Sequence, residues 1–216
     1  MAGLMHGIMF KRLGHCVHLI EQKLSSTRTD HAAGMGTGPL GLQFFKEHDL
    51  YPAPYSFSCP GFSFLDKHSN VKRLLNLPLN LTSWNVLYYR LRANFDGLQS
   101  EYCPKPIDFP ESDGKAIYDL GKRATNVVPN DNLATVEFDD LQAGGSRRID
   151  ADLVIVANGQ NSIIRRNFLP DRTEQPYSGY IVWRGTVPEK DVSDRTRKLF
   201  DSRFNVFAMS PGYIVG

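Results

Sequence analysis

The sequence predicts an α/β fold on three observations. First, the chain opens with a helix, a strand and an acid. Apolar residues recur at helical steps over residues 4–12, Gly14 stands where a helix ends, and residues 15–20 predict a strand that closes on Glu21. Second, residues 153–157 form an apolar run typical of a strand inside a parallel sheet. Third, shorter strands between these two regions follow the pattern of an antiparallel meander.

The composition is that of a folded, water-soluble chain of one large or two small domains. Its 216 residues are 41% hydrophobic and 22% charged. A formal net charge of +2 creates no broad field for a polyanion, so we expect no nucleic-acid partner. No apolar run approaches the ~20 residues that cross a bilayer, and we expect no membrane partner. Three distant cysteines suit reduced thiols in a cytoplasmic protein better than a disulfide framework.

Short elements are predicted after the opening acid. Residues 22–30 predict a polar loop. Glycines alternate in residues 34–38, but no apolar strand precedes them, so a loop is favoured over a phosphate cradle. A helix is expected over residues 39–48, with proline at its first position. Residues 61–65 and 71–75 predict the two strands of a hairpin.

The clearest helix covers residues 84–98, where apolar side chains fall on one face. Thr82 or Ser83 can serve as its N-cap. We expect the outer face of this helix to carry Arg90 and Arg92.

Strands dominate the rest of the prediction. They are expected near residues 125–128, 134–138, 147–149, 152–157, 204–209 and 213–215. Arg195, Arg197 and Lys198 are expected on the solvated face of a short helix.

The opening helix, strand and acid are typical of a dinucleotide-binding unit. Glu21 could accept both ribose hydroxyls of an adenosine, while the helix N-terminus faces the pyrophosphate. Gly3 would be the last glycine of the fingerprint, the one that allows close packing of helix and strand. A solvated carboxylate at a strand end would also explain Glu21. A plain NAD-dependent dehydrogenase would explain Glu21 too, but not the later Asn158-Gly159 turn or the antiparallel strands between them.

A second motif follows the apolar run of residues 153–157. A tight Asn158-Gly159 turn leads to Ser162, which is placed to cap a helix whose first turns hold Arg165. This motif resembles the second cofactor motif of the flavoprotein aromatic hydroxylases, the group that includes para-hydroxybenzoate hydroxylase. The stretches 82–97 and 177–188 look like the branch close to 2,6-dihydroxypyridine 3-monooxygenase.

The resemblance implies a domain plan. The chain would contain an incomplete Rossmann-like FAD-binding domain and, joined to it, an antiparallel β portion of a substrate domain. The implied parts are the first FAD-binding segment at 1–50, a substrate-side hairpin at 51–81, the continued FAD-binding domain at 82–170, and the start of the substrate-binding domain at 171–216.

The resemblance also implies how FAD is held. Glu21 would bind the adenosine ribose, Gly3 would lie beside the pyrophosphate, and the backbone near Val128 would lie beside the adenine. Either Arg90 or Arg92 would reach the phosphates; the sequence leaves this open, and Arg92 is taken as the candidate.

Asn158, Gly159 and Arg165 would shape the groove that NADH or NADPH approaches. Family members have Asp where Asn158 stands, and the change removes a partner for Arg165. Trp183 is expected in the core rather than in the substrate wall.

The chemistry implied is reduction of FAD by NADH or NADPH, reaction with oxygen to a flavin hydroperoxide, and hydroxylation of a small aromatic or hydroxypyridine-like substrate. Tyr55, His68 and Tyr180 are unranked candidates for the catalytic base, and no Cys or His spacing matches a metal site. The full-length protein could form a homodimer.

A competing interpretation is a non-catalytic remnant or a mis-bounded gene model that binds no flavin. The family has a strand and two glycines ahead of Gly3, and a Gly-Asp motif beyond residue 216. From this we expect the given chain to fold poorly and to hold FAD weakly or not at all.

Overall fold

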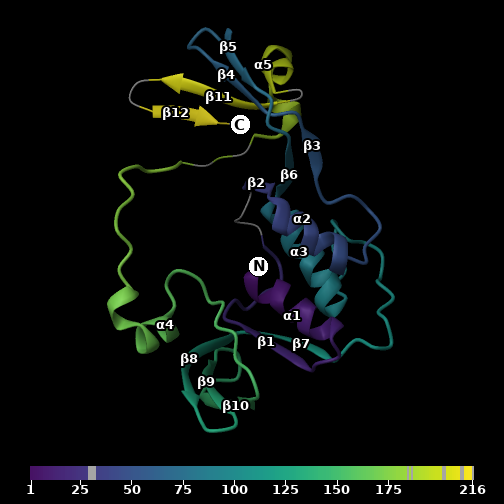
Figure 1. Ribbon diagram of the computed structural model, residues 1–216, viewed down its shortest axis with the longest axis vertical. Helices are drawn as coiled ribbons and strands as arrows, with labels where there is room; N and C mark the ends of the chain where they lie inside the picture. The colour runs from purple at the N-terminus through teal and green to yellow at the C-terminus, as the bar shows by residue number, and fades with distance from the viewer. Residues whose placement is uncertain (29–32, 184, 186, 201–202, 210–211, 216) are drawn as a thin grey trace. The chain divides into compact units, whose positions relative to one another are not determined.

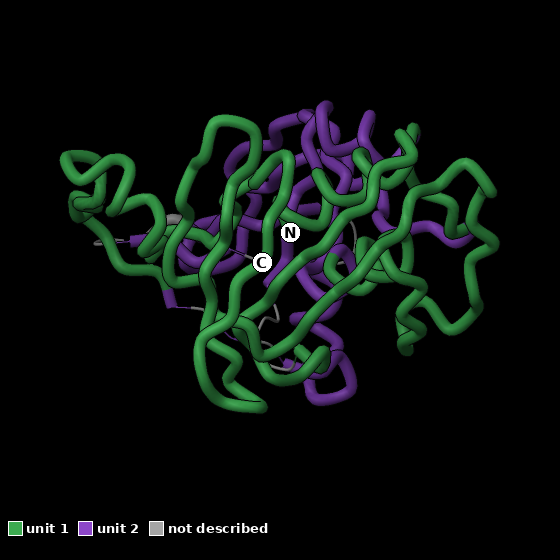
Figure 2. The backbone as a smooth tube through the Cα atoms, turned by 90° about the horizontal axis from the view of Figure 1, so that it is seen from below, with its two compact units in different colours: residues 1–30, 47–51, 88–182 green, residues 31–46, 52–87, 183–216 purple. Residues whose placement is uncertain are grey.

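The computed structural model describes residues 1–28, 33–183, 185, 187–200, 203–209 and 212–215. The chain forms two compact units, coloured separately in Figure 2. Unit 1 consists of Met1–Asp30, Glu47–Tyr51 and Tyr88–Val182, and unit 2 of His31–Lys46, Pro52–Leu87 and Trp183–Gly216. The chain therefore passes repeatedly between units. The cofactor and substrate roles assigned to 1–50, 51–81, 82–170 and 171–216 stay predictions.

Unit 1 begins with the predicted helix, strand and acid (Figure 1). Helix α1 (Ala2–Arg12) ends where Gly14 adopts a positive φ of 85°, a conformation that glycine adopts without steric cost. Strand β1 (Val17–Glu21) follows and pairs in parallel with β7 (Ala116–Leu120). The register sets Glu21 opposite Leu120, at the carboxyl ends of both strands.

The predicted meander is confirmed in unit 1, with longer strands than the sequence indicated. β8 (Lys122–Pro129), β9 (Ala134–Asp140) and β10 (Ser146–Ala151) form an antiparallel sheet in the order β10-β9-β8. Helix α4 (Ile163–Phe168) follows, and Ser162 caps it as predicted, its Oγ accepting the Arg165 amide at 2.9 Å. The 3-10 turn η1 (Pro170–Arg172) comes directly after it.

The prediction of a buried parallel strand over residues 152–157 is wrong. The described backbone there forms no strand, and Leu153 and Val156 are 61% and 46% exposed. A strand forms only where a neighbouring edge completes its hydrogen bonds. In the described part of unit 1 the parallel sheet consists of β1 and β7, and neither strand pairs with this run.

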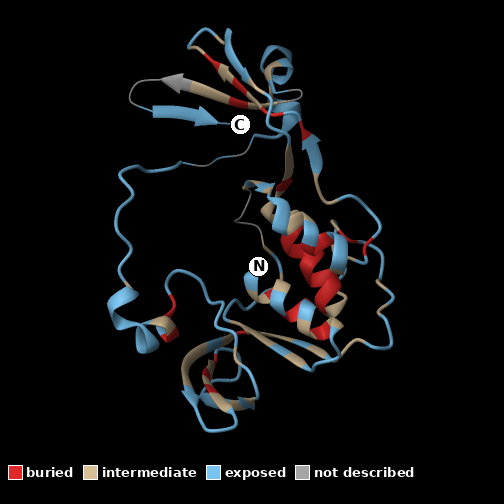
Figure 3. Cartoon of the chain, in the orientation of Figure 1, coloured by how far each residue is buried: buried red, intermediate tan, exposed pale blue. Residues whose placement is uncertain are grey.

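Helix α3 (Trp84–Asp96) carries much of the buried surface coloured red in Figure 3. It begins as predicted after Ser83, whose Oγ accepts the Val86 amide at 3.2 Å. The prediction of an outer face with Arg90 and Arg92 is wrong, because these side chains are only 3% and 4% exposed. Periodicity indicated one apolar face, but acidic and aromatic partners bury the other.

Unit 2 contains a three-stranded antiparallel sheet in the order β2-β6-β3. Its strands are β2 (Gly34–Thr37), β3 (Phe57–Cys59) and β6 (Leu79–Ser83). The prediction of a loop over residues 34–38 is therefore wrong for 34–37. The β6 edge supplies hydrogen bonds that compensate for the low strand preference of glycine. Helix α2 (Pro39–His48) has the predicted bounds.

A second sheet of unit 2 joins strands distant in sequence, in the order β12-β11-β4-β5. β4 (Phe62–Leu65) and β5 (Val71–Leu75) form the predicted hairpin. β11 (Phe204–Met209) pairs in parallel with β4 and antiparallel with β12 (Gly212–Val215). The 3-10 turn η2 (Glu189–Asp191) and the predicted short helix, α5 (Asp194–Leu199), precede β11.

No helix within the described ranges is both long enough and apolar enough to cross a bilayer.

Candidate functional site

Glu21 is the last residue of β1, and its carboxylate contacts protein groups while remaining partly exposed to solvent. Its Oε1 accepts the amide of Lys23 at 2.8 Å, and its Oε2 lies 3.6 Å from Nη2 of Arg28. The Glu21 side chain is 28% exposed. A carboxylate has about four acceptor positions, so these contacts leave positions for further donors.

The N-terminus of α1 lies close to this carboxylate. Burial lowers the pKa of the Met1 amino group, Glu21 acts on it in the opposite direction, and Arg28 lowers it further. No side chain caps this helix end, and no acid stands in its first turn. A helix N-terminus carries unpaired amide groups and the positive end of the helix dipole.

Gly3 lies beside a residue of each predicted motif, the strand before Glu21 and the segment before Asn158. A Cβ atom at Gly3 would lie 3.4 Å from Cβ of Ala157 and 3.7 Å from Cδ1 of Leu19. The strand that leads to Glu21 and the segment that leads to Asn158 therefore both contact the first turn of α1. Leu19 and Ala157, which precede Glu21 and Asn158 in the chain, thus both lie beside Gly3 in unit 1. A shared nucleotide site at Glu21 and Asn158 stays a prediction.

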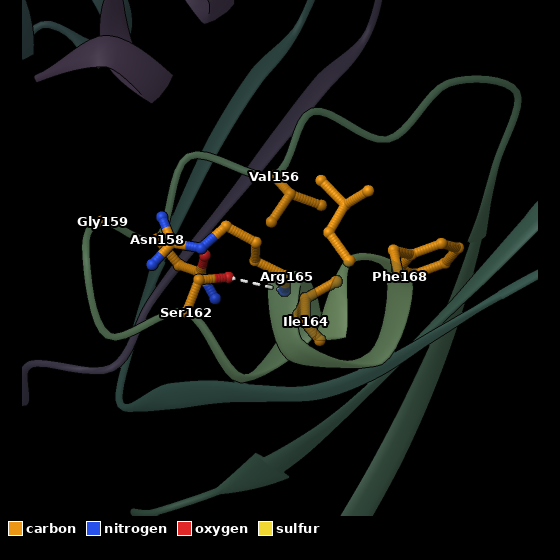
Figure 4. A pocket seen from close by; sticks show the side chains of 8 residues that line it. Val156, Asn158, Gly159, Ser162, Ile164, Arg165 and Phe168 are labelled. Carbon is orange, nitrogen blue, oxygen red and sulfur yellow. Dashed lines mark hydrogen bonds between the residues drawn. The ribbon is translucent and has the colours of Figure 1, made fainter. Parts of the chain in front are cut away.

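A pocket of about 290 Å³ brings together three predicted residues, Asn158, Gly159 and Arg165 (Figure 4). The complete lining is Val156, Asn158, Gly159, Ser162, Ile164, Arg165, Phe168 and Leu169. Gly159 has a φ of 82°, which explains the glycine at this bend. Figure 4 shows the Arg165 side chain extending toward Asn158. Arg165 donates to the backbone oxygen of Gln160, while its buried Nε has no hydrogen-bond partner among the described residues.

Arg92 lies inside unit 1, with its guanidinium engaged by protein groups. Its Nη2 and Nε contact the two oxygens of Asp96 at 2.7 and 3.1 Å, and Nη1 donates to the Tyr88 hydroxyl at 3.0 Å. The plane lies 3.6 Å from the centroid of the Tyr118 ring. Although burial alone would lower the pKa of Arg92, Asp96 and Tyr88 raise it above its ordinary value.

Arg90 is engaged elsewhere in unit 1. Its Nε pairs with Asp49 at 2.8 Å, and its Nη2 donates to the backbone oxygen of Tyr51 at 2.6 Å. Both arginines of α3 are bound by protein groups, and the choice between them as a phosphate ligand stays a prediction.

The other predicted residues are spread over both units. Val128 lies on β8 opposite Thr135 and is 39% exposed. The base candidate Tyr55, in unit 2, stacks on Phe45 with ring centroids 4.2 Å apart. Trp183 is 92% exposed, so its predicted place in the core is wrong.

The two remaining base candidates are both exposed. His68 lies in the turn between β4 and β5 in unit 2, and Tyr180, in unit 1, is 60% exposed. Arg184 and Thr186 of the stretch 177–188 lie outside the described residues.

Sequence reasoning missed Arg28, the residue that faces Glu21. Its side chain is only 7% exposed, although it lies in a segment predicted as a solvated polar loop. The sequence signalled this contact only by placing an arginine seven positions after Glu21. Spacing within a loop does not predict which side chains meet, so the contact could not be predicted from it.

Part of the chain is similar in sequence to known proteins. Residues 177–216 match a protein-family model described as FAD binding domain-like. A segment of 102 residues, 47% of this chain, is 29% identical to 2,6-dihydroxypyridine 3-monooxygenase of Paenarthrobacter nicotinovorans and covers 24% of that protein.

Two solved structures have a similar fold. The structure of 2,6-dihydroxypyridine-3-hydroxylase from Arthrobacter nicotinovorans superposes with a TM-score of 0.75 at 19% identity, over 98% of this chain and 48% of that one. The flavin-dependent monooxygenase PieE, solved in complex with FAD and substrate, gives a TM-score of 0.54 at 14% identity, over 77% of this chain and 30% of that one. This chain thus spans about half the length of the hydroxylase that it matches. Part of the chain is therefore similar in sequence to 2,6-dihydroxypyridine 3-monooxygenase, and its fold is similar to those of these two solved structures.

Proposed function

We propose that this chain supplies the adenine-nucleotide side of an FAD site in a monooxygenase. The proposed enzyme hydroxylates a small aromatic or hydroxypyridine-like substrate, with oxygen and NADH or NADPH as co-substrates. One observation carries the proposal: the strand ending in Glu21 and the segment ending in Asn158 meet at Gly3 in the first turn of α1. The relationship to 2,6-dihydroxypyridine 3-monooxygenase supports the substrate class.

The residues at this place fit the adenosine half of FAD. Glu21 has acceptor positions for ribose hydroxyls, and the uncapped N-terminus of α1 suits a pyrophosphate. In this proposal Gly3 lies beside the pyrophosphate and Val128 beside the adenine. When bound, FAD would supply electron transfer and oxygen activation, while the chain binds the cofactor, orients it and excludes water.

The pocket beside α4 is our proposed approach for the nicotinamide nucleotide. Its lining contains one cation, Arg165, and no carboxylate, because Asn158 stands where the resembling family has an acid. An uncompensated guanidinium favours an anionic group. We therefore expect Arg165 to face a phosphate of NADH or NADPH, with Gly159 providing the bend.

In this proposal Arg92 contributes to FAD binding indirectly. Because its donors are taken by Asp96 and Tyr88, we propose that it supports the cofactor site through Tyr88 instead of reaching a phosphate.

Titration of the purified chain with FAD tests the proposal. E21Q removes the charge that would bind the ribose hydroxyls but keeps the size of the side chain. We expect FAD affinity, followed by flavin fluorescence, to fall by about tenfold or more. E111Q is the matched control, because Glu111 is exposed and lies near Asp113, which pairs with Arg12 at the other end of α1.

Equal FAD affinity of wild type and E21Q would contradict the assignment of Glu21. A wild-type chain that binds no FAD would favour the interpretation as a non-catalytic remnant. If FAD binds, substrate-dependent oxidation of NADH or NADPH in the presence of 2,6-dihydroxypyridine tests the proposed reaction.

A further inference from the structure

The loop after β1 is folded so that Arg28 returns to Glu21. The amide of Thr27 donates to Oγ of Ser25 at 3.0 Å, and a guanidinium nitrogen of Arg28 donates to the backbone oxygen of Ser25. The amide of Arg28 donates to the Tyr89 hydroxyl at 3.0 Å, which ties the loop to α3. These contacts fix the backbone at Arg28 independently of the carboxylate that its side chain faces.

The guanidinium of Arg28 rests on an ordered layer of side chains. It lies 5.0 Å from the centroid of the Tyr88 ring. The Tyr88 hydroxyl accepts a hydrogen bond from Arg92, and Arg92 in turn stacks on the Tyr118 ring. Arg28 thus contacts the Tyr88 ring, and Arg92 contacts the rings of both Tyr88 and Tyr118. These cation–π contacts stabilise the position of the Arg28 guanidinium.

The contact between Arg28 and Glu21 restrains the carboxylate without using up its acceptors. At 3.6 Å from Nη2 to Oε2, the contact is an ion pair that is too long for a good hydrogen bond. The Lys23 amide holds the other oxygen, Oε1, at 2.8 Å. Because Lys23 restrains Oε1 and Arg28 restrains Oε2, the Glu21 carboxylate keeps one orientation. Its remaining lone pairs then point in fixed directions.

We propose that Arg28 is a positioning residue that aims the carboxylate of Glu21 at a ribose diol. This inference rests on the proposed function, since it concerns the same nucleotide site. The retained carboxylate also opposes a 2′-phosphate, so the pair selects an adenosine whose ribose hydroxyls are both free. Arg28 itself makes no contact with the ligand in this arrangement.

Calorimetric titration with two probes, ADP and 2′,3′-dideoxy-ADP, separates positioning from general support of the fold. The wild-type chain is expected to prefer ADP, because only ADP offers the diol to Glu21. In R28M, ADP affinity should fall by about tenfold while dideoxy-ADP affinity stays unchanged. R147M is the matched control at an exposed position of β10 and should bind both probes like wild type.

A milder variant, R28K, keeps the charge but lacks the planar fork of the guanidinium. The preference of R28K for ADP should lie between those of wild type and R28M. An equal loss of both probes in R28M and R28K would overturn the proposal, because it would indicate a structural role. An unchanged preference in both would also overturn it. A wild-type chain that binds neither probe would overturn the nucleotide site itself, whereas the first two results leave that site standing.

Discussion

At the scale of single residues, Lys11 of unit 1 is an ionisable group that is almost fully buried. Its side chain is 4% exposed at the C-terminal end of α1, where Nζ donates to the backbone oxygen of Phe95 at 2.9 Å. Asp113 lies 3.5 Å from Nζ, and the Phe109 ring centroid 3.1 Å. Burial lowers the pKa of Lys11 to about 8, although Asp113 acts in the opposite direction.

This lowered pKa predicts how stability depends on pH. Between about pH 8 and the ordinary lysine value of 10.5, the folded state binds fewer protons at Lys11 than the unfolded state. The free energy of unfolding should therefore rise with pH in this window, by at most about 1.4 kcal/mol per pH unit from this group. Urea denaturation of wild type and K11M at pH 7 and pH 9.5 measures the difference.

The comparison with K11M isolates the lysine from other groups. Burial raises the pKa values of Cys103 and Tyr118, and these groups lower stability as the pH rises. Both remain in K11M, so their effects cancel in the difference. A wild-type minus K11M difference that does not change with pH would contradict the assignment.

At the scale of elements, α1 shows that two glycines of one helix differ in what surrounds them. A Cβ atom at Gly7 would lie 2.8 Å from Cε2 of Phe95, a fully buried ring. At Gly3 the nearest atom would be 3.4 Å away, which is an ordinary contact. The closest approach to a glycine of α1 is therefore that of Phe95 of α3 to Gly7, whereas Gly3 faces Leu19 of β1 and Ala157.

Alanine substitutions test this difference within the same helix. G7A should lower the free energy of unfolding by about 1–3 kcal/mol, because the Phe95 ring must shift. G3A should be neutral or raise it by up to about 1 kcal/mol, since alanine favours a helix over glycine. Thermal and urea denaturation of both variants give the comparison, and an equal loss of stability would refute it.

Element types followed from local patterns wherever a strand or helix had strong signals of its own. The Pro39 start of α2, the Ser83 cap of α3 and the hairpin of β4 and β5 are local features, and all were predicted. The elements that were predicted wrongly depended on whether a neighbouring strand was present to pair with them. Residues 34–37 became a strand through the β6 edge, and residues 153–157 remained unpaired despite an ideal apolar run.

At the scale of the whole molecule, the C-terminal part of the chain is held in unit 2 by strand pairing. Residues 177–183 are exposed and form neither helix nor strand. β11 pairs with β4, the amide of Phe204 donates to the backbone oxygen of Gly61 at 3.1 Å, and Arg203 donates to Asn76 at 2.8 Å. A break in residues 177–183 would leave these contacts in place.

Limited digestion with chymotrypsin should therefore cut first within residues 177–183, where Tyr177, Tyr180 and Trp183 are exposed. The C-terminal piece should stay bound to the rest of the chain after the cut. Denaturing gels would show two fragments, while gel filtration under native conditions would show them eluting together. Separate elution of the C-terminal piece would contradict the β11–β4 pairing.

The sequence by itself determined the order and type of most elements. It also placed Glu21 and Gly3 at element ends and predicted a bend with glycine at position 159. These features depend on periodicity, capping and backbone conformation, which neighbouring residues set. Only the tertiary structure decided that Arg90 and Arg92 are buried and that Arg28 faces Glu21. Such contacts join residues distant in sequence or lie in a loop without periodicity, so their geometry comes from the packing of the whole unit.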